Sequence, residues 1–254
     1  MRRIRVIPIL LLHNRGLVKS VRFRNYKYVG DPINAVRIFN EKEVDEICIL
    51  DITATRQRRG PDQEHISEIV SEAFMPLSYG GGVTSIEEVE RLFFNGVEKV
   101  VLNHGAVHNQ GLIGQIADRY GRQSVTASID HKAGWLGGST AYSLNGEEKV
   151  GIDPVTLARR FADAGAGEIL LNSIDRDGTY AGFDLRTVEK VARAVRLPVV
   201  ACGGAGSVED LRRAIDAGAS AVAAGSLFVF QRPHNAVLIS YPPREVLEKE
   251  LIGK

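Results

Sequence analysis

A glycine-rich stretch occurs twice in the chain at a fixed spacing. Residues 79–85 (YGGGVTS) are echoed by residues 201–207 (ACGGAGS), which lie 122 positions further along. The same spacing relates Pro76 to Pro198, together with several flanking residues. This regularity indicates an internal duplication, so the fold must divide into two similar halves.

Short apolar runs alternate with segments of helical periodicity, a pattern typical of a parallel sheet built from strand and helix units. Several helical segments begin with Asp or Ser at the N-cap position, and two have a proline directly after it. We expect strands at 4–12, 46–53, 76–80, 98–103, 123–130, 167–173, 198–202 and 220–225, and helices over 31–39, 85–94, 153–164 and 207–217. Eight strands predict an α/β fold, a single (β/α)8 TIM barrel that forms one domain over residues 1–254. Its half-barrels cover roughly 1–122 and 123–230, and a C-terminal helix or tail covers 231–254.

The composition argues against several classes of protein. Hydrophobic residues make up 44% of the 254 residues and charged residues 25%, as in ordinary globular proteins, and the net charge is only +1. This balance gives no reason to expect a nucleic acid or a membrane as partner. The two cysteines, Cys48 and Cys202, lack metal-type spacing, so we expect no metal, no cofactor and a reducing cytoplasmic location. The apolar run 6–12 contains Pro8 and has no cleavage site, and we interpret it as the first strand.

The two glycine stretches predict two phosphate sites. In each copy an apolar strand ends in glycines and is followed by Ser and an acidic helix start, so backbone N–H groups and a helix N-terminus meet where an anion could bind. The strand ends that follow each copy would complete the sites. A ligand with a phosphate at each end would then span the barrel mouth. The candidate phosphate-binding residues are Gly81, Gly82 and Asn103 in the first half, and Gly203, Gly204, Gly225 and Ser226 in the second.

Active residues of such barrels lie at the carboxyl ends of the strands. Asp130 ends the fifth strand, where a partly desolvated carboxylate could act as general acid or base, the alternative being a structural role. Lys19 and Asp177 are further catalytic candidates, although one of Asp175 and Asp177 could instead pair with Arg176. Candidate substrate-lining residues at other strand ends are Asp51, His104, Asn172 and Cys202.

Three loops are longer than a turn requires. Residues 13–31 contain four basic and three aromatic side chains, which suits either a mobile lid over an anionic ligand or a solvated basic loop. Residues 54–60, with Arg56, Arg58 and Arg59, are predicted to be a solvated loop. Residues 132–150, with Trp135 and the turn signal Asn145-Gly146, predict an inserted β-hairpin.

Four charged residues begin strands and should meet at the opposite end of the barrel. They are Arg5, Glu46, Lys99 and Glu168. A stabilising ring of ion pairs is the default interpretation at this end. The alternative is a gated entrance to the barrel axis.

Several further motifs lie along the chain. They are RVIP at 5–8, LVK at 17–19, GDP at 30–32, LDITA at 50–54, GGG at 80–82, SID at 128–130, GAGEILL at 165–171, SIDRDGT at 173–179 and GGAG at 203–206. On these motifs the chain resembles the cyclase subunit of imidazole glycerol phosphate synthase from residue 4 to about residue 230.

This resemblance implies a half-barrel duplication of the ribulose-phosphate-binding type and a substrate phosphorylated at both ends. It also implies that a glutaminase subunit docks on the bottom of the barrel and supplies ammonia through a tunnel. The four strand-start charges match the charged gate of that tunnel, which favours the gate over a purely structural ring.

The chain departs from the cyclase pattern at the first strand. Cyclase subunits carry Asp-x-Lys-Asp-Gly-Arg there, and the first Asp is one of two catalytic carboxylates, the other matching Asp130. This chain has Leu11 at that position, and a leucine cannot transfer a proton. His104 replaces a hydroxyl residue after Asn103, and Cys202 replaces a serine at the second phosphate site.

The pattern RVIPxLLL followed by GLVK resembles cyclase-like paralogues of surface-polysaccharide (lipopolysaccharide) pathways. Such paralogues work with a glutaminase-like partner and a sugar amidotransferase to add an amidino group to an N-acetylated sugar. The leading hypothesis is therefore an ammonia-channelling subunit of such a system. The alternatives are a true cyclase subunit of histidine biosynthesis, a non-catalytic phosphate-binding scaffold that activates its partners, and a sugar-phosphate isomerase on the same barrel.

Overall fold

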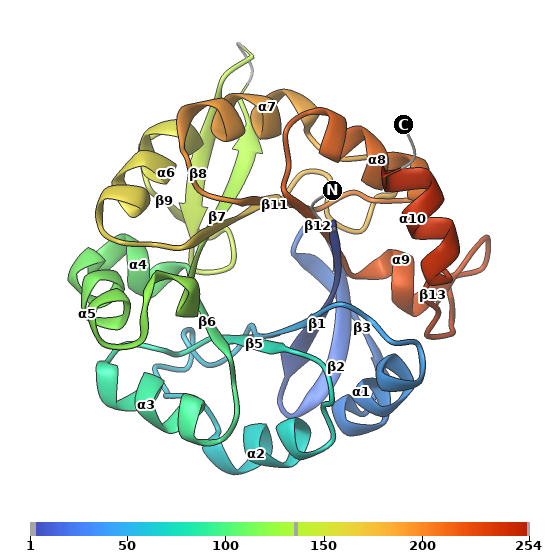
Figure 1. The fold of residues 1–254 in the computed structure, drawn as a ribbon, viewed down its shortest axis with the longest axis horizontal. Helices are drawn as coiled ribbons and strands as arrows, with labels where there is room; N and C mark the ends of the chain where they lie inside the picture. The colour runs from blue at the N-terminus through green and yellow to red at the C-terminus, as the bar shows by residue number, and fades with distance from the viewer. Residues whose placement is uncertain (1–3, 135–136, 253–254) are drawn as a thin grey trace.

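The computed structural model describes residues 4–134 and 137–252. Trp135, which was predicted to belong to the inserted hairpin, lies outside the described residues. Its centre is a closed barrel of parallel strands surrounded by helices (Figure 1). β1 (Arg5–His13) pairs in parallel with both β4 (Ile47–Asp51) and β12 (Ala221–Ala224), and the pairing of β7 with β10 completes the circle. The remaining barrel strands are β5 (Leu77–Gly80), β6 (Lys99–Leu102), β7 (Val125–Ala133), β10 (Glu168–Ser173) and β11 (Val199–Cys202). The predicted (β/α)8 barrel is confirmed, and each predicted strand overlaps one of these.

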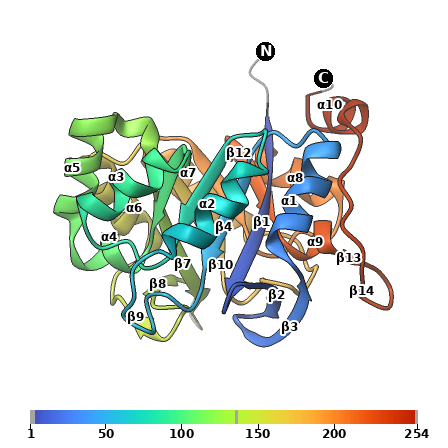
Figure 2. The ribbon, with the colours of Figure 1, turned by 90° about the horizontal axis from the view of Figure 1, so that it is seen from below.

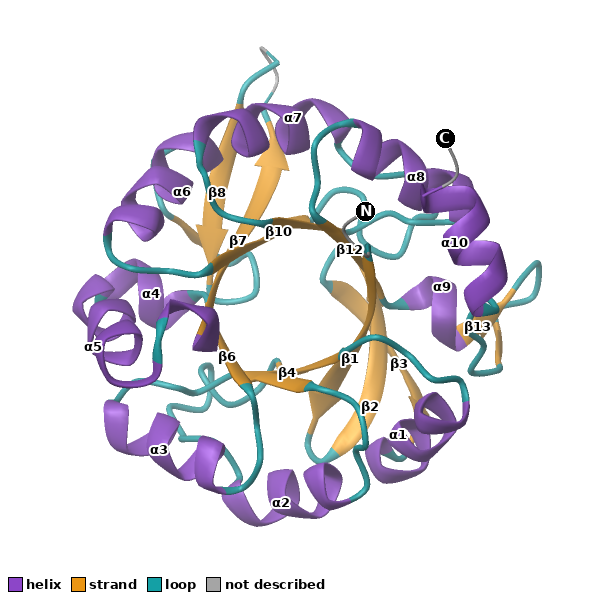
Figure 3. Cartoon of the chain, viewed as in Figure 1, coloured by secondary structure: helices purple, strands orange, loops and turns teal. Residues whose placement is uncertain are grey.

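The helices form an outer ring around the strands (Figure 3). They are α1 (Pro32–Glu41), α2 (Gln63–Ser71), α3 (Ile86–Phe94), α4 (His104–His108), α5 (Gln110–Tyr120), α6 (Pro154–Asp163), α7 (Leu185–Ala194), α8 (Val208–Asp216), α9 (Ser226–Val229) and α10 (Arg244–Ile252), with a short 3-10 turn, η1 (Arg122–Ser124). None of the helices in the described ranges is both long and apolar enough to cross a membrane.

The helices begin where the sequence places caps. The Asp31 carboxylate accepts a hydrogen bond from the Asn34 N–H at 2.9 Å, and Asp153 caps α6 in the same way, each with proline as the first helical residue. Ser85 caps α3 by accepting from the N–H of Glu88. Ser207, its repeat partner, caps α8, so the duplication extends to the helix starts.

Two apolar layers hold the barrel. The larger one lies between the strands and the helices. The smaller one fills the inside of the barrel and includes Ile7, Ile9, Val101, Leu170 and Val200. Cys48 and Cys202 are buried in this inner layer, as free thiols. Burial raises the pKa of Cys48 to about 12, so its thiol stays protonated.

The two ends of the barrel differ (Figure 2). The start of β1 and helix α10 lie at one end, and two hairpins project from the other. One hairpin is formed by β2 (Gly16–Val21) and β3 (Arg24–Gly30), and the other insertion by β8 (Ser139–Ser143) and β9 (Glu148–Lys149). A further small hairpin, β13 (Phe230–Gln231) with β14 (Ala236–Val237), precedes α10.

The long segments are more ordered than the sequence predicts. The interpretation of 13–31 as a loop is wrong, because β2 pairs antiparallel with β1 and carries Lys19 into the interior, 4% exposed. The hairpin after the fifth strand is confirmed by the antiparallel pairing of β7 with β8, although Asn145-Gly146 forms the turn from β8 to β9. Segment 54–60 is not merely a solvated loop, since Arg59 binds a buried carboxylate.

Candidate active site

The carboxyl ends of the barrel strands surround one large cavity. It has about 1220 Å³ of space free of protein atoms, including the part open to solvent. All the residues predicted to act at the barrel mouth line it: Lys19, Asp51, Gly81, Gly82, Asn103, His104, Asp130, Asn172, Asp177, Cys202, Gly203, Gly204, Gly225 and Ser226.

The two glycine stretches adopt similar strained turns on the wall of this cavity. Gly81 and Gly82 have φ of 120° and 72°, and Gly203 and Gly204 have 85° and 115°, a region that residues with a side chain rarely adopt. A Cβ on Gly204 would also lie 2.2 Å from the Gly182 carbonyl oxygen. Both turns therefore require glycine and bring bare backbone to the cavity surface.

The N–H groups of the first turn are partly engaged within the protein. The Gly82 N–H donates to the Thr55 hydroxyl at 3.2 Å, and Thr55 also lines the cavity. The Asn103 side chain donates to the Ser128 carbonyl oxygen at 3.1 Å. A ligand at this turn would thus meet backbone groups and the Thr55 hydroxyl. The contribution of Thr55 was not predicted from the sequence, because it lies in a different loop.

Asp130 is buried at the bottom of the cavity, with 8% of its surface exposed. Burial raises the pKa of Asp130 to about 7, since a desolvated carboxylate favours its neutral form. A hydrogen bond from the Asn172 amide opposes this shift, and Asp177 adds to it. Within the described part of the chain, the buried Asn172 Oδ1 has no hydrogen-bond partner. Asp130 and Asn172 together thus offer one group that can exchange a proton and one free acceptor.

Lys19 and Asp177 form a second polar group next to the glycine end of β12. The Lys19 ammonium donates to the Ile9 carbonyl oxygen, and a Cβ on Gly225 would lie 2.2 Å from Lys19 Nζ. Burial lowers the pKa of Lys19 to about 8, although Asp177 partly opposes the shift. Burial raises the pKa of Asp177 despite a 2.9 Å hydrogen bond from the Ser20 hydroxyl.

Asp51 and Arg176 make contacts that were not predicted from the sequence. Both oxygens of Asp51 are already bound within the protein, one by the Thr53 hydroxyl at 2.7 Å and the other by Arg59 at 2.6 Å. Asp51 lines the cavity, but it mainly fixes the loop after β4. The predicted pairing of Arg176 with Asp175 or Asp177 is wrong, because the Arg176 guanidinium donates to the carbonyl oxygens of residues 181 and 182.

The four strand-start charges meet at the opposite end of the barrel. Arg5 binds Glu46 at 2.6 Å and also binds Glu168, while Lys99 lies 2.8 Å from Glu46 and 3.8 Å from Glu168. The carboxylates are the more buried members, with 5% and 11% of their side chains exposed. Each cation thus bridges both anions and closes the axis at this end.

A small space lies directly inside this ring. It is lined by both glutamates, Ser78 and Thr126 and by apolar side chains of the inner layer. Ile9, Val101 and Leu170 line both this space and the large cavity, so the apolar inner layer lies between the ring and the cavity.

Comparison with known proteins places the chain in a family. The model of the histidine biosynthesis protein family matches residues 5–233. The chain belongs to this family. A Pseudomonas aeruginosa protein, provisionally named imidazole glycerol phosphate synthase subunit hisF2, is 54% identical over 94% of this chain and 96% of its own length. A Leptospira interrogans protein provisionally named subunit HisF is 46% identical over 95% and 96%, and the Nocardioides sp. imidazole glycerol phosphate synthase subunit HisF is 40% identical over 89% and 91%.

Leu11, at the position where the sequence comparison predicts a departure from the cyclase pattern, lies at the cavity wall. Its side chain packs against the inner apolar layer, and its strand neighbours are Leu50 and Val18. The wall is therefore apolar at this point, while Lys19, Asp130 and Asn172 supply polar groups elsewhere in the cavity.

The buried Asp130 should make the stability of the protein depend on pH. An unfolded Asp has a pKa of about 3.9, so between pH 4 and 7 the folded protein holds a proton that the unfolded chain has lost. As the pH rises through this window, Asp130 should lower the free energy of unfolding by up to about 1.4 kcal/mol per pH unit, and Asp130→Asn should remove this contribution. Urea unfolding from pH 4 to 8 measures it. The exposed Asp118→Asn is the control and should keep the wild-type slope. Parallel profiles for wild type and Asp130→Asn would contradict the buried, neutral carboxyl.

Proposed function

We propose that this chain is a cyclase-type synthase subunit that receives ammonia at the end of the barrel where the strands begin and uses it in the cavity at the other end. The observation that carries this proposal is the ring of Arg5, Glu46, Lys99 and Glu168 over an apolar barrel interior. Neutral ammonia can cross an apolar layer at modest cost, whereas a charged ammonium ion cannot. A charged ring at the entrance and an apolar passage behind it therefore suit the transfer of ammonia.

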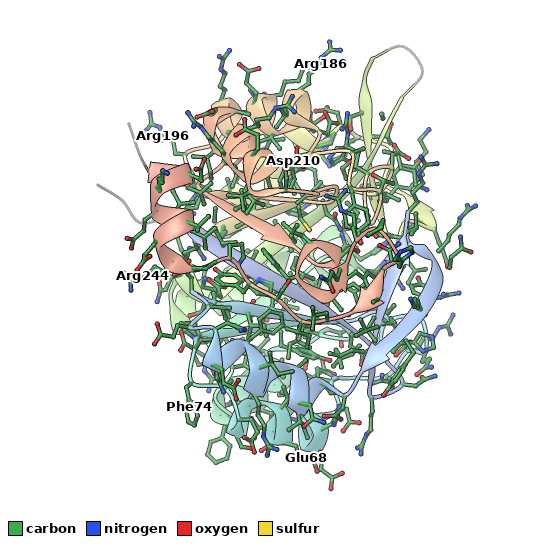
Figure 4. All side chains as sticks on the ribbon, turned by 90° about the vertical axis from the view of Figure 1, so that its right-hand side faces the viewer. Glu68, Phe74, Arg186, Arg196, Asp210 and Arg244 are labelled. Atoms are coloured by element: carbon green, nitrogen blue, oxygen red, sulfur yellow. The ribbon has the colours of Figure 1, made fainter. Side chains whose placement is uncertain are left out.

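Two exposed aromatic side chains support a partner at the entrance. Phe74 lies in the segment between α2 and β5 and is 89% exposed, and Phe94, at the end of α3, is 90% exposed. Phe74 projects into solvent at the end of the molecule that also carries α10 (Figure 4). Such apolar surface at the same end of the barrel as the ring suits a docking glutaminase subunit, which would release ammonia at this end.

The cavity suits a ligand that carries a phosphate at each end. One phosphate would bind at Gly82 with the Thr55 hydroxyl, and the other at Gly204 and Ser226, near the Lys19 ammonium. Between them lie Asp130, whose pKa near 7 suits a general acid or base at neutral pH, and the free acceptor of Asn172.

We further propose that the reaction served is amidination of an N-acetylated sugar in surface-polysaccharide biosynthesis, together with a sugar amidotransferase. The support is the combination of an intact ring with Leu11, which removes one of two catalytic carboxylates while keeping the ammonia path. The second candidate is a true cyclase subunit of histidine biosynthesis, favoured by retention of Asp130, Lys19 and both glycine turns. The third is a scaffold that binds phosphate and only activates its partners.

Phosphate binding can be measured at each turn separately. Titration of inorganic phosphate should shift the amide NMR signals of Gly82 and of Gly204 with saturable curves. The amide of Gly114, within α5, is the control and should not move. The proposal of a ligand with two phosphates is contradicted if the amide signals of neither turn, or of only one turn, shift at about 50 mM phosphate. This concentration is on the order of physiological anion levels or higher.

Lys99→Ala tests the gate. Loss of the Lys99 cation leaves Glu46 paired with Arg5 alone, so the ring should no longer close the barrel axis. Part of the ammonia released by the glutaminase partner should then escape into solution. The measurement compares glutamate formed with free ammonia released by the purified complex. Lys190→Ala, an exposed lysine on α7, is the matched control. Equal release by Lys99→Ala and wild type would argue against a gate.

Leu11→Asp tests the missing carboxylate. The wild type should convert the phosphoribosyl-formimino substrate poorly with ammonium salt, and Leu11→Asp should raise the rate by about 10²–10⁴-fold, the usual contribution of a positioned acid or base. Leu11→Asn, polar but unable to transfer a proton, should stay near the wild-type rate. Fast turnover by the wild type would support the true cyclase instead. No gain in Leu11→Asp would leave the scaffold as the better candidate.

A further inference from the structure

A cluster of two histidines and a glutamate lies at the rim of the cavity, outside the groups used above. His104 and His108 are four residues apart on α4, so their rings share one helix face, with ring centroids 4.3 Å apart. Glu148, at the start of β9, faces both rings. Figure 2 shows α4 and β9 at the same end of the barrel.

The distances within the cluster suit a small metal ion. His108 Nε2 lies 2.9 Å from one Glu148 oxygen and His104 Nδ1 lies 3.4 Å from the other, and one ligand atom from each residue falls within 4.8 Å of the rest. A tetrahedral ion with bonds of about 2.0–2.1 Å holds its ligand atoms roughly 3.3 Å apart. Small side-chain rotations are therefore enough to bring these three atoms into one coordination sphere.

The surroundings of the cluster are also those of a metal site. The Ser143 hydroxyl lies 3.3 Å from His104 Nδ1 and donates to Glu148, so it can orient a ligand from the second layer. His104 is about one-third exposed, and His108 is more open, which leaves an entry path from solvent. Two imidazoles and one carboxylate form a ligand set that zinc binds with a fourth position left for water or another oxygen.

We propose that His104, His108 and Glu148 bind one divalent transition metal ion, with Zn²⁺ as the ion that fits best. The ion joins α4, in the first half-barrel, to β9 in the second. Because His104 lines the cavity next to Asn103, the ion also places positive charge beside the first glycine turn. The sequence alone predicted no metal, since Glu148 is forty residues from His108 and only the fold brings them together.

The test uses the full-length, untagged chain after treatment with a chelator. Calorimetric titration with Zn²⁺ should show one equivalent bound, and Co²⁺ should give the visible absorption of a four-coordinate site. His108→Ala and Glu148→Gln should each weaken the affinity for Zn²⁺ by about tenfold to a hundredfold or more. Loss of a residue that only orients a metal ligand already has an effect of this size. His234→Ala, an exposed histidine on the β13–β14 hairpin, is the control and should bind as the wild type does.

Thermal unfolding distinguishes binding from damage to the fold. The metal-free variants should unfold at the wild-type temperature, and saturating Zn²⁺ should raise that temperature for wild type and His234→Ala only. Absence of saturable binding to the wild type would overturn the proposal. So would binding by His108→Ala that matches the wild type. Neither result depends on the reaction or on the ligand of the barrel cavity.

Discussion

Closure of the barrel is the constraint on which every functional feature depends. β1 must pair with β4 on one side and with β12 on the other, and the second pairing joins residues more than two hundred positions apart. Closure brings all parallel strand ends to one mouth and all strand starts to the opposite end. Groups that are distant in sequence therefore come together in two sites, an open cavity at the mouth and a charged ring at the opposite end.

The barrel interior separates these two sites electrostatically. At the ring, each carboxylate has a cation, so burial of four charges is offset within the cluster. At the mouth, Asp130 has no such cation at hydrogen-bond distance among its described contacts, and burial moves its pKa to about 7. The apolar layer between them, including Ile9 and Leu170, keeps the charges of the two sites apart. The arrangement thus favours charge at one end and proton exchange at the other.

The sequence predicted the barrel well because its signals were local. Apolar runs, caps such as Asp31 and Ser85, and the repeated glycines each constrain a few consecutive residues, and the predicted strands and helices followed from them. The clustering of the four charged residues of the ring was predictable too, because the starts of all parallel strands lie at one end of a closed barrel. Three features were not: the strand pairing of 13–31, the capture of Asp51 by Arg59, and the meeting of His108 with Glu148. Each depends on how a segment outside the regular strand and helix units packs on the rest of the barrel mouth, and that packing leaves no periodic signal in the sequence.

The duplication also explains why the departures from symmetry carry the functional information. Two equal halves would give two equal mouth sites, and the glycine turns and the caps at Ser85 and Ser207 retain that equality. The differences therefore mark what each half does alone. The first half has an apolar wall at Leu11 and a histidine, His104, beside its turn, whereas the second half supplies Asp130 and Asn172. Burial moves the pKa of Asp130, in the second half, to about 7 and that of Lys19, in the first half, to about 8, so each half places in the cavity one group that can exchange a proton near neutral pH.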